Sequence, residues 1–149
     1  MLKTKIPPPI IALLFIILTY LSSLVIVPFK FDNQSLLACL IFVMGLIFVL
    51  SAMRQFKQKN TIINPMTPQK TSALVVDGIF SYSRNPMYLG LLLVLTSSGI
   101  YFGAWLSLLL APLFCFLITT LQIVPEEEAM FKLFGESFVE YTKKVRRWI

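Results

Sequence analysis

Two clusters of polar side chains flank an apolar, charge-free stretch of this sequence, and their residue types suit a small charged ligand. Arg84, Asn85 and Tyr88 lie just before or at the start of the stretch, and Glu126 and Glu127 follow it directly. An arginine pairs with a carboxylate or phosphate, an amide both donates and accepts, and a carboxylate holds an ammonium group or sugar hydroxyls. Such groups are costly beside a membrane segment unless they bind something, so the pattern indicates a small-molecule site.

Each cluster also has a purely structural explanation. Pro86 suits the first position of a helix, so Arg84 and Asn85 would then mark an ordinary helix start at the membrane interface. Acidic residues in the first turn of a helix are favoured by the helix dipole, which accounts for one or two of the three glutamates 126–128. The residue types alone leave both explanations open.

The composition indicates an integral membrane protein with the lipid bilayer as its partner. Hydrophobic residues make up 57% of the 149 residues and charged residues 13%, against about 25% charged residues in soluble domains. The length suits one domain, 1–149. The net charge of +6 comes from basic residues that flank apolar stretches. That placement is typical of membrane topology, so we expect no nucleic-acid partner.

Several chemistries are excluded by residues and motifs that the sequence lacks. It contains no histidine, which rules out histidine metal sites, Ser-His-Asp triads and a histidine general base. Cys39 and Cys115 both lie within apolar stretches, so we expect neither a disulfide framework nor a metal site. There is also no Gly-x-Gly-x-x-Gly motif, P-loop or Gly-x-Ser-x-Gly nucleophile elbow.

Four apolar stretches are each near the length of about 20 residues that a bilayer core requires. They run from about 9 to 27, 35 to 53, 87 to 100 and 104 to 123. We therefore expect an all-α integral membrane protein with four transmembrane helices, the last two joined by a turn near 97–103. The first stretch has a basic start like that of a signal peptide. It is long and lacks a clear cleavage site, which favours an uncleaved helix.

A long loop and an amphipathic helix complete the expected architecture. The loop, 54–86, is too long for a simple helix connection, and beside a membrane such a loop is often functional. The alternative is a flexible linker. After Pro125, bulky residues recur at three- and four-residue steps, namely Phe131, Phe134, Phe138, Tyr141 and Val145. This spacing predicts a helix at 125–146 that lies on the membrane or on the hairpin. Gly135 within it indicates close backbone approach or a break.

The basic residues predict the orientation. The N-terminus, the segment 54–84 and the C-terminal tail hold twelve of the thirteen basic residues, and Lys30 is the exception. Four spans place these three segments on one side of the membrane, and the positive-inside rule makes that side the cytoplasm. Both ends of the chain would therefore be cytoplasmic.

Two ordered blocks of this sequence resemble the isoprenylcysteine carboxyl methyltransferase and phospholipid methyltransferase group of membrane enzymes. The first block is 74–90, with Arg84-Asn85-Pro86 at its centre, and the second begins at Glu126-Glu127. The second continues through Phe134-Gly135 and Tyr141 to 145–149. The blocks cover roughly the C-terminal half, and their order and spacing make the resemblance specific. It implies a transferase that uses S-adenosyl-L-methionine, bound outside a Rossmann fold.

The resemblance also implies roles for individual residues. The cofactor pocket would be lined by Ser72, Ala73, Leu74, Val75, Phe80, Asn85, Pro86, Met87, Tyr88 and Glu126. Arg84 and Glu127 are the catalytic candidates. Arg84 would bind the cofactor carboxylate, bind an anionic acceptor, or only support the loop. Glu127 would accept the proton that a neutral amine acceptor must lose. Gln122 is the candidate contact to the acceptor. The eukaryotic carboxyl methyltransferases have an arginine in place of Gln122 and a histidine in place of Asn85, which weakens the assignment of a prenylcysteine carboxylate as acceptor.

We therefore expect a membrane methyltransferase of bacterial type in the inner membrane. It would methylate a lipophilic or small acceptor (a thiol, a carboxylate or a lipid amine) at the cytosolic face. Transfer to a thiolate or carboxylate needs positioning and desolvation but no general base, which suits a chain without histidine. One alternative is an NADPH-dependent reductase of the sterol-reductase type, although Arg84 has no basic neighbours suited to a 2′-phosphate. The other is a non-catalytic membrane subunit.

Overall fold

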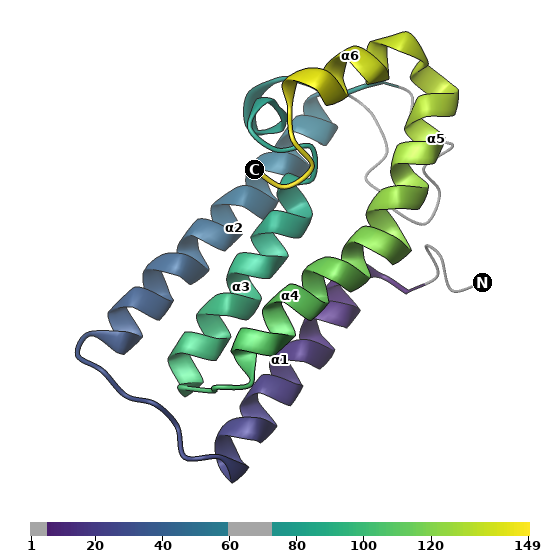
Figure 1. The fold of residues 1–149 in the computed structure, drawn as a ribbon. Coiled ribbons are helices and arrows are strands. Elements are labelled where there is room, and N and C mark those ends of the chain that lie inside the picture. Colours follow the sequence, from purple (N-terminus) through teal and green to yellow (C-terminus); the bar gives the residue numbers. More distant parts are fainter. Residues whose placement is uncertain (1–5, 60–72) are drawn as a thin grey trace.

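The computed structural model describes residues 6–59 and 73–149, and within these ranges the chain is helical, without a β-strand. In chain order the elements are α1 (Pro8–Val25), α2 (Gln34–Gln58), the 3-10 turn η2 (Gly78–Ser81), α3 (Pro86–Phe102), α4 (Ser107–Ile118), the π-helical turn η3 (Thr119–Ile123), α5 (Val124–Phe134) and α6 (Glu136–Lys144). Figure 1 shows α4 continuing through η3 into α5 as one long rod. The expected all-helical class is confirmed for the described residues.

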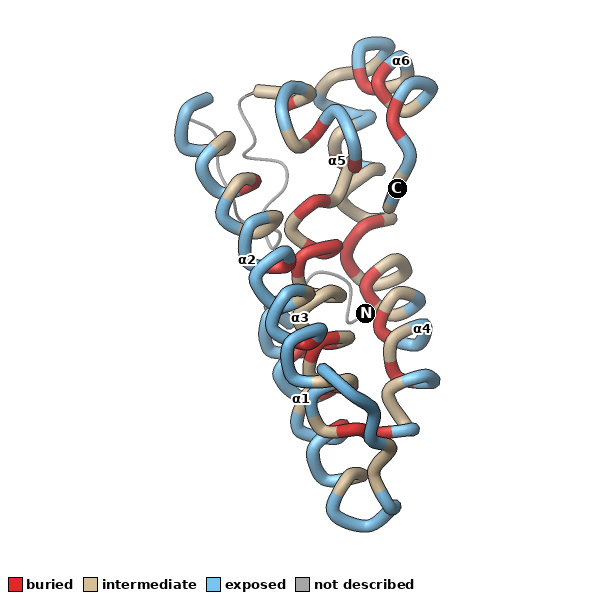
Figure 2. The backbone as a smooth tube through the Cα atoms, turned by 90° about the vertical axis from the view of Figure 1, so that its left-hand side faces the viewer, coloured by how far each residue is buried: buried red, intermediate tan, exposed pale blue. Residues whose placement is uncertain are grey.

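The outer surface of the helices is compatible with an integral membrane protein. Among the described residues, the helical stretches Pro8–Val25, Gln34–Gln58 and Ser107–Phe134 are long and apolar enough to cross a bilayer, and α3 is a shorter apolar helix. Large apolar side chains such as Leu13, Leu40 and Leu109 are exposed on them. Figure 2 shows the exposed residues along the outer sides of the helices and the buried residues between them. An apolar surface of this extent suits lipid better than water.

Helix α3 occupies the centre of the bundle and packs against α1, α2 and α4. Gly45 of α2 and Gly90 of α3 allow the two backbones to touch. A Cβ atom on Gly90 would lie 2.7 Å from the carbonyl oxygen of Gly45. On the other side of α3, Phe114 and Ile118 of α4 are fully buried in the core with α1. Small residues at such crossings are typical of membrane helices.

The turn between α3 and α4 depends on Gly103. Helix α3 continues to Phe102, so the turn shares only Gly103 with the predicted segment 97–103 and otherwise follows it. The φ of Gly103, 64°, is left-handed, a conformation that glycine adopts without steric penalty. A Cβ atom there would lie 2.3 Å from the carbonyl oxygen of Phe29, and the Phe29 amide donates to the Gly103 carbonyl at 2.9 Å. The loop between α1 and α2 is thereby attached to this end of the hairpin.

Helix boundaries differ from the predicted ones at two places. Helix α2 runs on to Gln58, beyond the predicted end at 53. The π turn at Thr119–Ile123 was not predicted. Its physical reason is Pro125, because a proline has no N–H for the carbonyl four residues earlier and its ring clashes with that carbonyl. A wider turn absorbs the mismatch without ending the helix.

The prediction of one helix over 125–146 was wrong, and the alternative of a break at Gly135 is confirmed. Gly135 has φ 51° and ψ −123°, a combination that is essentially restricted to glycine. The chain turns there, and α6 folds back over the loop before α3 (Figure 1). Its apolar face, with Phe138 and Tyr141, packs against Leu74 and Val76 of that loop, where a membrane or hairpin contact was expected.

Candidate functional site

The loop before α3 forms the first wall of the candidate site and is attached to the last turns of α2. Val75 and Phe80 are buried against Ala52, and the rings of Phe56 and Phe80 meet edge to face with centroids 5.1 Å apart. Gly78, with φ 57°, lies against the side chain of Gln55. The end of α2 thus holds the loop in place.

The first turn of α5 forms the second wall. Glu126 and Glu127 both lie in this turn, and Pro125 precedes them. The hydroxyl of Tyr88, in the first turn of α3, donates a hydrogen bond to Glu126 Oε1 at 2.5 Å. This bond joins the beginning of α3 to the beginning of α5, so the two predicted polar clusters do meet in space.

Helix α6 covers the site from above. Its Tyr141 hydroxyl donates to the carbonyl oxygen of Phe80 at 2.6 Å, which fixes α6 to the loop of the first wall. Burial raises the pKa of Tyr141, so the hydroxyl stays protonated at physiological pH and remains a donor. Phe138, one turn earlier, is buried beside it.

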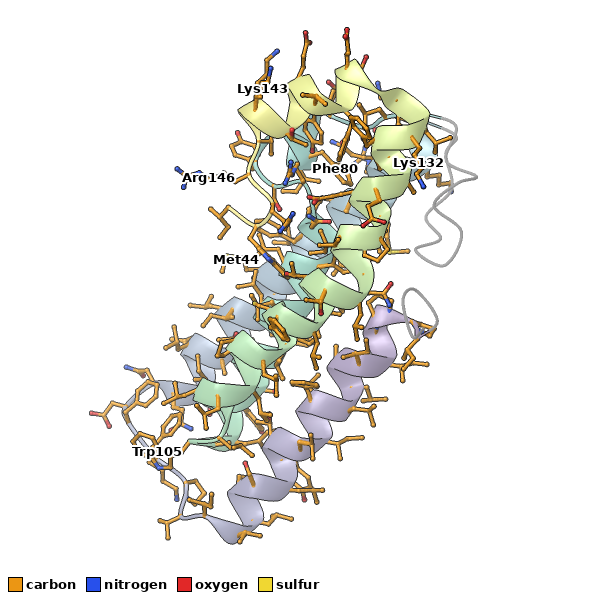
Figure 3. The ribbon with its side chains drawn as sticks, turned by 45° about the vertical axis from the view of Figure 1, so that its right-hand side comes forward. Met44, Phe80, Trp105, Lys132, Lys143 and Arg146 are labelled. Carbon is orange, nitrogen blue, oxygen red and sulfur yellow. The ribbon has the colours of Figure 1, made fainter. Side chains whose placement is uncertain are left out.

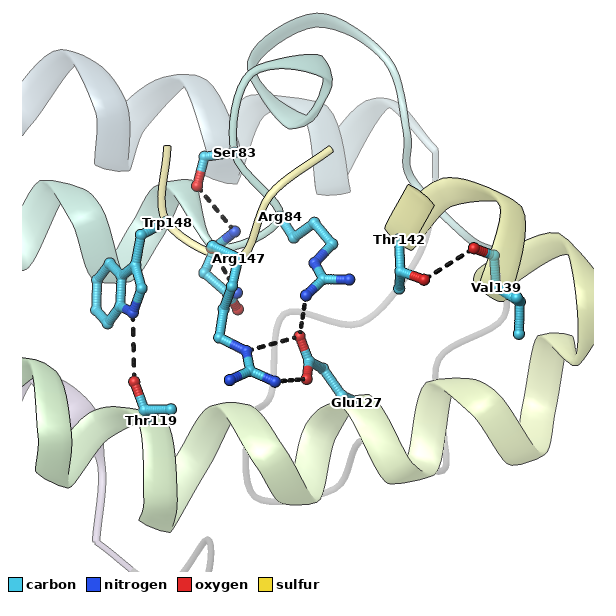
Figure 4. A network of polar contacts seen from close by, with 9 residues as sticks. Ser83, Arg84, Thr119, Glu127, Val139, Thr142, Arg147 and Trp148 are labelled. Carbon is cyan, nitrogen blue, oxygen red and sulfur yellow. Dashed lines mark hydrogen bonds and ion pairs between the residues drawn. The ribbon is translucent and has the colours of Figure 1, made fainter. Parts of the chain in front are cut away.

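A cluster of three charged side chains links the two walls (Figure 4). Arg84 Nη2 lies 2.8 Å from Glu127 Oε1. Arg147 binds the same carboxylate in bidentate fashion, with Nη2 2.6 Å from Oε2 and Nε 3.2 Å from Oε1. These hydrogen bonds raise the pKa of Arg147. Arg84 Nε is buried and has no hydrogen-bond partner among the described residues, which leaves one donor of the cluster unsatisfied.

The walls and the cover line a partly open cavity of about 110 Å³. Eight predicted site residues line it, namely Ala73, Leu74, Val75, Phe80, Arg84, Asn85, Glu126 and Glu127. Pockets for whole small-molecule ligands usually measure about 300–1,000 Å³. The described part of the cavity therefore has room for a portion of such a ligand.

Four further residues line the cavity, and they were not predicted as site residues: Phe56, Met130, Phe138 and Tyr141. Phe138 and Tyr141 belong to the apolar periodicity after Pro125, a signal that predicted a buried face but not what it faces. Phe56 and Met130 carry no comparable signal, because each is an ordinary apolar residue of a helix.

Other predicted site residues lie elsewhere or outside the described residues. Met87 packs against the cluster of Val75 and Phe80, and Pro86 is buried at the first position of α3. Gln122 is buried on the side of η3 that faces the start of α1, where its Nε2 donates to the Ile6 carbonyl at 2.7 Å. It is not part of the cavity lining. Ser72 falls outside the described residues.

The C-terminal tail, 145–149, crosses between the two walls. The Arg84 amide donates to the Arg146 carbonyl at 3.1 Å, and Asn85 Nδ2 donates to the Arg147 carbonyl at 3.0 Å. Trp148 Nε1 donates to Thr119 Oγ1 at 3.3 Å (Figure 4). Composition and periodicity gave no indication of these contacts; only the resemblance had drawn attention to the tail.

Comparisons with known proteins identify one matching family and two relatives. The sequence pattern of the family described as phospholipid methyltransferase matches residues 33–137. A protein-S-isoprenylcysteine O-methyltransferase of Schizosaccharomyces pombe is 34% identical over 95 residues, which make up 64% of this chain and 40% of that protein. An uncharacterized protein of Haemophilus influenzae is 38% identical over 66 residues, 42% of this chain and 100% of that protein. No solved structure gives a significant match.

The matched regions have different extents. The chain spans well under half of the S. pombe relative. The family pattern, by contrast, covers well over half of the present chain and contains both polar clusters and the first turns of α3 and α5. On this basis, the chain belongs to the phospholipid methyltransferase family.

Proposed function

We propose that this chain is a membrane methyltransferase that uses S-adenosyl-L-methionine and methylates a lipophilic or small acceptor. The observation that carries the proposal is the meeting of a guanidinium and a carboxyl group in one cavity, with Arg84 on the loop and Glu126 on α5. Such a pair suits a ligand that carries both a carboxylate and an ammonium group. Membership of the phospholipid methyltransferase family, and the name of the S. pombe relative, support methyl transfer as the reaction.

The residues present fit this cofactor. Arg84 lines the cavity, and its buried Nε has no acceptor among the described residues. An unsatisfied buried donor is unfavourable, and a carboxylate would satisfy it. Glu126 would hold the ammonium group or the ribose hydroxyls. Apolar contact would come from Ala73, Leu74, Val75 and Phe80, and Asn85 would add a polar side-chain amide to the lining.

The chain itself would contribute positioning and exclusion of water. When bound, the cofactor supplies an activated methyl group, which forms a bond to the acceptor as the carbon–sulfur bond breaks and sulfur keeps the electron pair. Phe80 and Phe138 make part of the cavity wall apolar, which desolvates the reacting groups. Tyr88 holds Glu126 in place by its hydrogen bond. Distance and alignment are the largest contributions available to such a site.

The surroundings of Glu127 favour acceptors that need no general base. Both of its carboxylate oxygens accept hydrogen bonds or ion pairs from Arg84 and Arg147. With both oxygens already engaged by guanidinium groups, Glu127 is poorly placed to contact an acceptor amine. A thiolate or carboxylate acceptor has no proton to lose, and we favour these two over a neutral amine.

We further propose that four helices span the membrane, α1, α2, α3 and α4, with the site at the cytosolic face of a bacterial inner membrane. Helix α3 has 17 residues, a length of about 25 Å, which is close to the bilayer core of about 30 Å. In Figure 1 the end of α2, the start of α3, and α5 and α6 gather at one end of the molecule. The basic residues near this end predict that it is cytoplasmic, with both chain ends on that side.

Calorimetry on the purified protein in detergent would test the proposal. S-adenosylhomocysteine should bind to the wild type, and a folded protein that does not bind it at millimolar concentration would refute the assignment. Competition with NADPH separates this assignment from a reductase. The acceptor can then be sought by incubating membrane extracts with labelled S-adenosylmethionine and looking for a product that the Glu126→Ala variant fails to make.

A further inference from the structure

Arg147 adds a positive charge to an ion pair, Arg84–Glu127, that would be balanced without it. Glu127 already has one cationic partner in Arg84, at 2.8 Å, and this pair by itself would be neutral. Arg147 adds a second guanidinium to the same carboxylate, at 2.6 Å. Two cations on one anion leave the cluster with one positive charge beside the cavity.

The two arginines differ in how completely their guanidinium groups are engaged by Glu127. Arg147 directs Nε and Nη2 at Glu127 in a bidentate pair, the geometry in which guanidinium and carboxylate match best. Arg84 contacts Glu127 through Nη2 and lines the cavity, and its buried Nε has no partner among the described residues. Its side chain is 12% exposed, compared with 38% for Arg147, so its charge is the less screened of the two.

We propose that Arg147 is a positioning residue that neutralises Glu127 and thereby leaves Arg84 available for the carboxylate of the bound ligand. The inference rests on the proposed function, since it concerns how that ligand is held. Without Arg147, Glu127 would be the full counterion of Arg84 and would compete with the incoming carboxylate. The tail backbone supports the arrangement, because the Arg146 and Arg147 carbonyls accept from the Arg84 amide and the Asn85 side chain.

The test compares two ligands that differ only in the carboxylate, S-adenosylmethionine and its decarboxylated form. We expect Arg147→Gln to weaken the binding of S-adenosylmethionine about tenfold, the effect of losing one charged hydrogen-bond interaction, and to leave the decarboxylated ligand unchanged. An equal loss for both ligands would mean that Arg147 is merely structural. No loss for either would also overturn the inference.

Two further variants sharpen the test. In Arg147→Gln/Glu127→Gln the cluster regains one uncompensated positive charge, on Arg84, so the affinity for S-adenosylmethionine should recover; failure to recover would contradict the charge-balance explanation. Arg146→Gln is the matched control, because it removes a neighbouring charge whose side chain is exposed and directed outward (Figure 3). It should bind both ligands like the wild type.

The outcomes separate the inference from the proposed function. If the wild type binds neither ligand, the proposed function fails. If it binds both and Arg147→Gln behaves like Arg146→Gln, the positioning role alone fails. A measurement without ligand is a double-mutant cycle on thermal unfolding for Arg147→Gln and Glu127→Gln. Their effects should be non-additive, because the two side chains are in direct contact; additive effects would overturn the inference.

Discussion

Glu126 and Glu127 are neighbours in the sequence, but their carboxylates have different partners. Glu127 faces two arginines and is held by three contacts. Glu126 receives the hydroxyl of Tyr88 and lines the cavity. The two adjacent glutamates therefore differ in role: Glu127 ties the walls and the tail together, and Glu126 is the carboxylate that we propose binds the ligand.

The bond between Tyr88 and Glu126 leads to a prediction about a single hydroxyl. Tyr88→Phe leaves the ring in the core and removes the donor from a half-buried carboxylate. We expect a loss of about 1–3 kcal/mol in the free energy of unfolding and weaker binding of S-adenosylhomocysteine. Unfolding in detergent and calorimetry would measure the two effects.

Tyr82→Phe is the matched control for this substitution. The Tyr82 side chain is 75% exposed, so loss of its hydroxyl should change neither stability nor affinity. If Tyr88→Phe proves as mild as Tyr82→Phe, the hydrogen bond to Glu126 has no role in holding the site.

At the scale of the elements, the site depends on how α3 lies against α2, because α2 anchors the loop that leads into α3. Gly90→Ala would place a Cβ atom 2.7 Å from the Gly45 carbonyl oxygen and 2.6 Å from Val49 Cγ2. Overpacking of this kind destabilises by about 1–3 kcal/mol, despite the better helix propensity of alanine. The free energy of unfolding in detergent would show the loss.

A second substitution identifies which neighbour is responsible. Val49→Ala in the Gly90→Ala background removes the contact with the Val49 side chain. The contact with the Gly45 carbonyl oxygen remains, because a backbone carbonyl can move only together with its helix. We expect little recovery of stability. Full recovery would mean that the side chain of Val49, and not backbone contact, sets the distance between α2 and α3.

The turn between α5 and α6 places the cover over the cavity, and it too depends on one glycine. Gly135→Ala meets no atom within 4 Å, so its effect comes from the backbone conformation alone, about 1–3 kcal/mol. Because α6 carries Phe138 and Tyr141 into the cavity wall, S-adenosylhomocysteine should also bind less tightly. Ser137→Ala, on an exposed position of α6, is the control and should behave as wild type in calorimetry and unfolding. An unaffected Gly135→Ala protein would show that this turn tolerates an L side chain.

The elements differ in how far the sequence could predict them, for physical reasons. Long apolar stretches are local signals, so the helices were predicted. The hairpin turn was expected too early in the chain, at 97–103, and only Gly103 of that segment belongs to it. The break at Gly135 remained one of two alternatives, because glycine permits an unusual backbone without requiring it. The π turn arises because Pro125 has no N–H for the carbonyl four residues before it. The hydrophobic pattern carries no information about this missing hydrogen bond.

At the scale of the whole molecule, the site joins segments that are distant in sequence. Lining residues come from α2, the loop, α5 and α6, and the tail contacts Arg84, Asn85 and Thr119. The two polar clusters could be predicted because ionisable groups beside apolar stretches stand out by type. Phe56 and Met130 could not, since their role depends only on which helix ends meet. The contacts of Arg147 with Asn85 and Glu127 could not be predicted either, because they depend on how the tail packs against the two walls.

The proposed orientation of the whole molecule leads to a prediction about the accessibility of its two ends. Twelve of the thirteen basic residues lie in segments assigned to the cytoplasm, and moving them across the membrane is unfavourable. In a background with Cys39 and Cys115 replaced by serine, single cysteines at Lys30 and Lys144 should differ. Lys30→Cys should react with a membrane-impermeant thiol reagent in intact spheroplasts, and Lys144→Cys only after permeabilisation. Both positions are exposed, so the membrane and not burial determines access. The opposite pattern would mean that the topology is inverted. With four spans, the loop at Lys30 and the tail lie on opposite sides of the membrane. Equal labelling of both positions in intact spheroplasts would therefore contradict four spans.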